Sequence, residues 1–277
     1  MEMTVIWAIG IALLVLALLW LLLLLPRQGA PGWEALGRAR YAHRGLHSLT
    51  AGRPENSMAA FRAAVELGFG AELDVHLMRD GSLAVVHDSS LKRVCGREAV
   101  IEDLTAPELA GYPLQGTPET IPLLEDVLEL FAGRAPLIIE LKAERGNAAA
   151  LTDAVMARLE GWQGTYCIES FHPAVLLRLK GRYPQVLRGQ LSQNFRRGSE
   201  AGGLSWPVRL ALTLLLTTVF TRPDFIAYNY RDRACPSLRL MRRLYGVREV
   251  GWTIRDRAVM EALEREGVTP IFEGFVP

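Results

Sequence analysis

Residues 40–88 read RYAHRGLHSLTAGRPENSMAAFRAAVELGFGAELDVHLMRDGSLAVVHD and alternate short apolar segments with one helical pattern. Apolar residues at consecutive positions predict three buried strands here, at Arg40–His43, Ala71–Val75 and Leu83–His87. Between the first two strands, Ser57–Leu67 has apolar residues at helical spacing, with Asn56 or Ser57 as the N-cap. The link from Val75 to Leu83 is too short for a helix, so the chain must return through a turn.

The rest of the chain continues this alternation. Five more strands are predicted, at Leu137–Leu141, Tyr166–Ser170, Val186–Leu191, Phe225–Tyr228 and Glu249–Ile254. Helical patterns occupy Ile121–Phe131, Ala148–Leu159, Ala174–Lys180 and Arg257–Glu266. Eight strands with intervening helices predict an α/β protein, a (β/α)8 TIM barrel formed by residues 39–277. The stretch from Asp88 to Pro118 is too long for a plain loop, so we expect a small insertion at about 89–118, after the third strand.

The N-terminal segment is uniformly apolar. Residues 4–25 carry no charge and would span about 33 Å as a helix, which matches the roughly 30 Å hydrocarbon core of a bilayer. A cleaved signal peptide is the alternative, but Met1-Glu2-Met3 lacks the positive residues of its n-region. We therefore predict a single-pass anchor at residues 1–26 that contacts the lipid bilayer through residues 4–25, then a linker at 27–38. Basic residues follow the span and none precedes it, which favours a catalytic domain on the cytoplasmic side.

The overall composition excludes some classes of partner. The 277 residues include 31 Lys plus Arg and 30 Asp plus Glu, a net charge of +1, whereas a nucleic-acid-binding protein usually has a basic excess. We therefore expect no nucleic-acid partner. Cys95, Cys167 and Cys235 are odd in number and scattered, so they predict neither a disulfide framework nor a zinc site.

A second apolar run occupies Leu210–Phe220. Eleven residues are too few to span a bilayer. Two interpretations remain open: a buried helix of the barrel, or a helix that dips into the membrane surface beside the anchor.

Polar residues gather at the predicted strand ends, where a barrel of this kind has its active site. They are His43, Arg44, Glu72, Asp74, His87, Glu140 and Lys142. Glu72 and Asp74 share one face of their strand by its period of two. Burying even one carboxylate alone costs several kcal/mol, so three converging carboxylates imply a bound cation. Oxygen ligands without cysteine favour Mg²⁺ or Ca²⁺ over zinc.

The accompanying basic residues suggest the chemistry. Arg44 and Lys142 at strand ends would hold an anion, and a metal beside them would neutralise charge that develops on phosphate oxygens. His43 and His87 could then transfer protons, because histidine has its pKa near neutrality. This combination predicts phosphodiester cleavage.

Six motifs in order resemble the glycerophosphodiester phosphodiesterase family. They are His43-Arg44-Gly45, Pro54-Glu55-Asn56-Ser57 with Ala60-Phe61, Glu72-Leu73-Asp74-Val75, Asp80-Gly81, Val86-His87-Asp88 and Glu140-Leu141-Lys142. The resemblance covers roughly residues 39–277. It implies a metal-dependent barrel hydrolase that releases sn-glycerol 3-phosphate and an alcohol from a glycerophosphodiester.

The resemblance also implies a role for each matching residue. Glu72, Asp74 and Glu140 would be metal ligands, and His43 and His87 the acid–base pair. Arg44 and Lys142 would contact phosphate, and Glu55 would support the same site. Trp252 is a candidate aromatic wall for the substrate, with core packing as the equal alternative.

The C-terminal segment departs from the family pattern, which usually has an Asp-Gly pair after the Trp-Thr strand. Here residues 267–274 read GVTPIFEG. The rival hypotheses are a phospholipase-C-like or lysophospholipase-D-like phosphodiesterase and an inactive, membrane-tethered binding protein. The anchor and the Leu210–Phe220 run further suggest substrates at the membrane, such as lysophospholipids.

Overall fold

The computed structural model describes residues 2–27, 29, 32–197 and 203–277. The strands are β1 (Tyr41–His43), β2 (Gly70–Leu77), β3 (Leu83–Val85), β4 (Leu137–Leu141), β5 (Tyr166–Ser170), β6 (Arg188–Ser192), β7 (Phe225–Asn229), β8 (Arg248–Ile254) and β9 (Val268–Phe272). The longer helices are α1 (Glu2–Leu24), α3 (Met58–Glu66), α5 (Leu124–Phe131), α6 (Ala148–Leu159), α7 (Pro173–Arg182), α8 (Trp206–Thr213), α10 (Pro236–Tyr245) and α11 (Arg257–Arg265). Shorter ones are α2 (Trp33–Gly37), α4 (Lys92–Cys95), α9 (Thr218–Thr221) and the 3₁₀ turns η1 (Leu49–Ala51), η2 (Ile101–Asp103), η3 (Ala106–Gly111) and η5 (Tyr230–Asp232).

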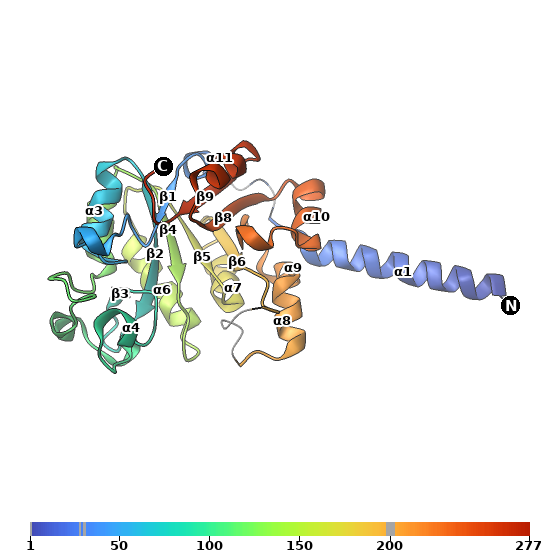
Figure 1. Cartoon of the computed structure of the whole chain (residues 1–277). Coiled ribbons are helices and arrows are strands. Elements are labelled where there is room, and N and C mark those ends of the chain that lie inside the picture. The colour runs from blue at the N-terminus through green and yellow to red at the C-terminus, as the bar shows by residue number, and fades with distance from the viewer. Residues whose placement is uncertain (1, 28, 30–31, 198–202) are drawn as a thin grey trace.

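Eight parallel strands close into a barrel (Figure 1). The sheet runs β1-β9-β8-β7-β6-β5-β4-β2, and β1 also pairs with β2. Tyr41 is opposite Gly70 on one side and Ile271 on the other, so β1 joins the two ends of the sheet. The predicted (β/α)8 barrel is therefore confirmed.

Two strand assignments need correction. The predicted barrel strand Leu83–His87 is β3, which pairs antiparallel with the last residues of β2 and lies outside the barrel. The reason is the length of β2: its first residues pair with β1 and β4, and its end extends far enough to form a hairpin with β3. The eighth barrel strand is β9, which was not predicted because Pro270 interrupts a short apolar run.

The predicted helices are confirmed within a few residues as α3, α5, α6, α7 and α11. Ser57 is the N-cap of α3, because its hydroxyl accepts a hydrogen bond from the Ala60 N–H at 3.1 Å. α10 was not predicted.

The predicted linker is corrected in part. Residues 33–37 form helix α2, in which Leu36 is buried and Trp33 packs on Phe225 inside the barrel. Residues 28, 30 and 31 of the linker lie outside the described residues, as does Met1 of the anchor. α2 closes the N-terminal end of the barrel, since the Tyr41 hydroxyl donates to the Leu36 carbonyl at 2.9 Å.

The region between β3 and α5 has a core of its own. Val86, Leu91, Ile101 and Ile121 are buried together there. This unit is attached to the barrel through His76 of β2, whose Nδ1 lies 2.6 Å from Glu102. The anomalous length after Asp88 is thus explained by a small packed insertion.

The N-terminal helix projects from the barrel (Figure 1). Met3–Leu24 is long and apolar enough to cross a membrane. Its last turn, however, packs against the barrel: Leu24 is fully buried with Leu215 and Leu238. Backbone carbonyls of this turn accept hydrogen bonds from the hydroxyls of Thr218 (2.7 Å) and Tyr245 (2.9 Å).

The Leu210–Phe220 run is not one helix. α8 ends at Thr213 and α9 begins at Thr218, and Leu215 between them has a φ of 57°. This left-handed residue breaks the helix and turns the Leu215 side chain into the contact with Leu24. The prediction of a continuous buried helix is wrong, since Phe220 is 64% exposed.

Candidate active site

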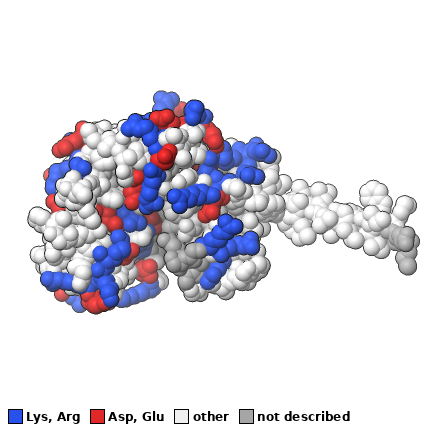
Figure 2. Space-filling view, in the orientation of Figure 1, with Lys and Arg blue, Asp and Glu red and all other residues white. Residues whose placement is uncertain are grey.

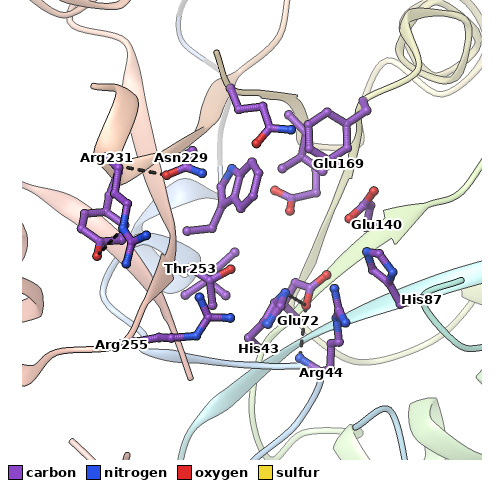
Figure 3. Close-up of a pocket in the computed structure, with 16 residues that line it drawn as sticks. His43, Arg44, Glu72, His87, Glu140, Glu169, Asn229, Arg231, Thr253 and Arg255 are labelled. Carbon is purple, nitrogen blue, oxygen red and sulfur yellow. Dashed lines mark hydrogen bonds and ion pairs between the residues drawn. The ribbon is translucent and has the colours of Figure 1, made fainter. Parts of the chain in front are cut away.

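A polar pocket of about 270 Å³ lies at the C-terminal ends of the barrel strands (Figure 3). Six of the predicted residues line it: His43, Arg44, Glu72, His87, Glu140 and Trp252. They come from β1, β2, β4, β8 and the segment after β3, which the sheet register brings to one edge. Sequence-distant residues therefore meet as predicted.

The three predicted metal ligands form one buried cluster. Glu72, Asp74 and Glu140 each offer a carboxylate oxygen, and these oxygens lie within 4.8 Å of one another. Asp74 is directly opposite Glu140 in the β2–β4 register, so the parallel pairing itself sets their separation. Hard oxygen donors at this spacing suit Mg²⁺ or Ca²⁺.

The electrostatics of the cluster fit a cation. Burial, together with repulsion from Asp74 and Glu140, raises the pKa of Glu72 well above its usual value. Burial also raises the pKa of Glu140, although Lys142 opposes this effect. Burial alone would raise the pKa of Asp74, but Lys142, His87 and Arg44 hold it well below its usual value. A divalent cation would relieve the repulsion that disfavours the charged carboxylates.

Two basic side chains already touch the cluster. The Lys142 ammonium lies 2.9 Å from Asp74 Oδ1 and 2.7 Å from Glu140 Oε1. Arg44 lies 3.4 Å from Asp74 and donates to Glu55 at 2.7 Å. Glu55 thus positions Arg44 rather than lining the pocket, and its pKa is lowered to about 2, because contacts with Arg93 and Arg44 outweigh the opposing effect of burial.

Each histidine is oriented by a carboxylate. His43 Nδ1 lies 3.0 Å from Glu273 Oε2, and His87 Nδ1 lies 2.7 Å from Asp88 Oδ1. Because a carboxylate accepts, Nδ1 carries the proton in both rings and Nε2 is left available. His43 Nε2 lies 3.8 Å from Glu72, beside the cluster. Burial lowers the pKa of His43 to about 4, so its ring is neutral at pH 7.

The structure adds residues that the sequence did not single out. Glu169 of β5 is buried in the pocket, and burial with repulsion from Glu140 raises its pKa well above the usual value. Asn56 donates to Asp74 at 2.9 Å. Glu169 could have been found, because it is an acidic residue in an apolar strand, as Glu140 is. Glu273 could not have been found, because it follows β9, which was not predicted.

Trp252 lines the pocket as expected for an aromatic wall, and it also packs edge-on against Phe171 at 5.6 Å between ring centroids. The ring contact agrees with core packing, and contact of Trp252 with the substrate stays a prediction. Gln193, Asn229 and Arg231 complete the opposite side of the pocket.

Comparisons with known proteins show the family of this chain. The Glycerophosphoryl diester phosphodiesterase family matches residues 43–276. A glycerophosphodiester phosphodiesterase of Caldanaerobacter subterraneus is 29% identical over 83% of this chain and 91% of its own length. One of Bacillus altitudinis is 35% identical over 53% of this chain, and the match spans only 63% of that protein.

Two further comparisons concern the fold and the substrate. A phosphodiesterase of Oleispira antarctica, solved with the product sn-glycerol-3-phosphate, has the same fold, with a TM-score of 0.67 at 22% identity over 85% of this chain and 92% of that one. A lysophospholipase D of Rattus norvegicus is 40% identical, but over only 32% of each chain.

The barrel and its site define a phosphoric diester hydrolase. The chain belongs to the glycerophosphoryl diester phosphodiesterase family.

The Glu273–His43 contact leads to a first prediction. Glu273→Gln keeps an acceptor for His43 Nδ1 but removes the negative charge that stabilises a protonated ring. We expect kcat on glycerophosphocholine to fall about 10- to 100-fold with little change in KM, because the contact would orient His43 for the proton transfer that the sequence predicts. Steady-state kinetics measures the changes in kcat and KM separately. An increase in KM alone would show that Glu273 acts on substrate binding instead.

Proposed function

We propose that this protein hydrolyses glycerophosphodiesters to sn-glycerol 3-phosphate and an alcohol in a metal-dependent reaction. The observation that carries the proposal is the buried Glu72–Asp74–Glu140 cluster beside two histidines that carboxylates orient in the same way. The family match and the names of the relatives support the same reaction.

Glu72, Asp74 and Glu140 would hold the divalent cation, Mg²⁺ or Ca²⁺. Bound there, the cation would neutralise negative charge on the phosphate oxygens. Arg44 and Lys142 both contact the carboxylate cluster, and both would contact the phosphate. Trp252 would provide an apolar wall for the glycerol.

His43 and His87 would transfer the protons. Water, or the neighbouring glycerol hydroxyl, attacks phosphorus, and the attacking oxygen loses its proton to a histidine. The bond between phosphorus and the leaving alcohol breaks, and the alkoxide takes a proton from the other histidine. One water is consumed overall, either directly or in opening a cyclic phosphate. Because His43 is neutral, we assign it the proton-accepting role.

The N-terminal helix would be a membrane anchor. Its last turn makes specific contacts with the barrel through Leu24, Thr218 and Tyr245, whereas a cleaved signal peptide has no such requirement. Arg27, just after the span, lies 2.6 Å from Asp224 and so ties the chain to the barrel. The basic residues that follow the span favour a barrel on the cytoplasmic side.

The test uses the full chain in detergent with glycerophosphocholine as substrate. We expect release of sn-glycerol 3-phosphate and choline in the presence of Mg²⁺ or Ca²⁺, and loss of release with a chelator that the metal restores. A cyclic phosphate as the final product would identify a phospholipase-C-like lyase. Binding of the diester without any turnover, with either metal, would favour the inactive binding protein.

The leaving alcohol and any acyl chain are a separate question. The rat relative is named a lysophospholipase D, which extends the candidate substrates from water-soluble diesters to lysophospholipids.

A further inference from the structure

A second, larger hollow adjoins the polar pocket. Its volume is about 800 Å³, and its lining has far more apolar than polar surface. It begins at His87, Glu140 and Lys142, which belong to the candidate active site, and it ends at Val208 and Ala211 of α8. We call this hollow the α8 groove.

The α8 groove and the polar pocket form one continuous amphipathic site. They share His87, Glu140 and Phe171. The polar pocket has about 270 Å³, enough for a small polar group, whereas the groove is walled by Phe171, Phe195 and Leu212. A ligand that fits both therefore has a charged end and one apolar chain.

α8, which forms one wall of the groove, lies on the side of the barrel from which α1 leaves (Figure 1). α9, which follows α8, contacts the last turn of α1, and Figure 1 places α8 beside α9 at the base of the projecting helix. Because Leu24 is buried against the barrel, this arrangement is fixed rather than left to a free linker. The groove is thus held at the level where α1 would enter a bilayer.

The surface around the base of α1 suits a membrane. Trp206 of α8 and Phe220 of α9 are 65% and 64% exposed, and Val208 of α8 and Leu244 of α10 are exposed as well. Residues 203–247 contain seven arginines against two aspartates, and Figure 2 shows basic side chains close to the projecting helix. Exposed aromatic residues among basic ones are typical of a lipid interface.

We propose that the α8 groove binds the single acyl chain of a lysoglycerophospholipid whose phosphodiester occupies the site of the proposed hydrolysis. The inference rests on the proposed function and specifies its substrate. The lysolipid enters from the bilayer along α8, and its headgroup alcohol is released while the acyl chain stays in the groove.

The test compares choline release from glycerophosphocholine and from lysophosphatidylcholines with acyl chains of increasing length, below their critical micelle concentrations. Both substrates lose the same alcohol, so they differ only in the chain. For the full chain, kcat/KM should rise about fourfold per added methylene until the groove is filled.

Two variants test the groove itself. Ala211→Trp fills it and Val208→Asp makes its wall polar, so each should lower kcat/KM for the long-chain lysolipid at least tenfold and leave glycerophosphocholine within twofold. Leu177→Asp is the matched control, because Leu177 on α7 is 44% exposed, close to the 43% of Val208, and does not line the groove.

The outcomes separate the two proposals. Cleavage of neither substrate by the wild type would overturn the proposed function as well. If glycerophosphocholine is cleaved but an acyl chain does not raise kcat/KM, only the proposal about the groove is overturned. The same holds if Ala211→Trp and Val208→Asp lower kcat/KM equally for both substrates. If diacyl phosphatidylcholine is turned over as fast as the long-chain lysolipid, the assignment of a single acyl chain to the groove is overturned.

Discussion

His43→Gln should reduce the turnover of glycerophosphocholine by about 10²- to 10⁴-fold, the range expected for loss of a general base. His43 is half-buried and neutral, its Nδ1 donates to Glu273, and its Nε2 lies beside Glu72. Glutamine has a similar length but cannot take up a proton at neutral pH. Steady-state kinetics with saturating metal would measure the loss in kcat.

The control for this variant is His172→Gln. His172 is outside the polar pocket and accepts a hydrogen bond from the Ala174 N–H at the start of α7. We expect it to retain activity on glycerophosphocholine within a few fold. If His43→Gln unfolds at the same temperature as the wild type and still turns over at the wild-type rate, the proton-transfer role of His43 is wrong.

The second large effect is expected at the carboxylate cluster. Glu72→Gln has nearly the same shape but removes one charged ligand, so both metal binding and turnover should be lost, with kcat/KM reduced about 10³-fold. The unfolding temperature of the wild type should rise on addition of Mg²⁺ or Ca²⁺, because a ligand that binds only the folded state stabilises it. In Glu72→Gln this rise should disappear.

The metal-free protein provides an independent check. Repulsion from Asp74 and Glu140 disfavours the charged form of Glu72, so a neutral glutamine there should leave the unfolding temperature unchanged or higher without metal. Glu249→Gln is the control, because it removes a buried carboxylate that Arg242 contacts at the other end of β8. The Glu249→Gln variant should keep the metal-induced rise in unfolding temperature. If metal raises the unfolding temperature of Glu72→Gln as much as that of the wild type, the cation binds elsewhere.

Local sequence patterns were enough to predict the class of fold and to name most of the residues that meet at the pocket. Apolar runs at Leu137–Leu141 and Tyr166–Ser170 predict buried parallel strands, and the alternation of Glu72 with Asp74 places both carboxylates on one face. These are local signals, since periodicity and strand ends depend only on neighbouring residues. The cluster of three carboxylates followed from them, because parallel strands bring their C-terminal ends to one edge.

Tertiary structure decided what depends on pairing between distant segments. β3 has the composition of a barrel strand but pairs antiparallel, because the end of β2 extends beyond its barrel neighbours. β9 closes the barrel despite Pro270, and it is this closure that brings Glu273 to His43, 230 residues away in sequence. A contact over that separation leaves no pattern in the local sequence.

The positions of the N-terminal helix and of the α8 groove also depend on contacts between segments that are distant in sequence. Composition shows that residues 4–25 are long and apolar enough to span a membrane, but nothing in it indicates that Leu24 packs against Leu215. Leu215 makes that contact from the left-handed position between α8 and α9, and α8 lines the groove that adjoins the active site. Hydrophobic burial is non-directional, so a sequence specifies which residues are apolar, and only the folded chain specifies which partners they cover.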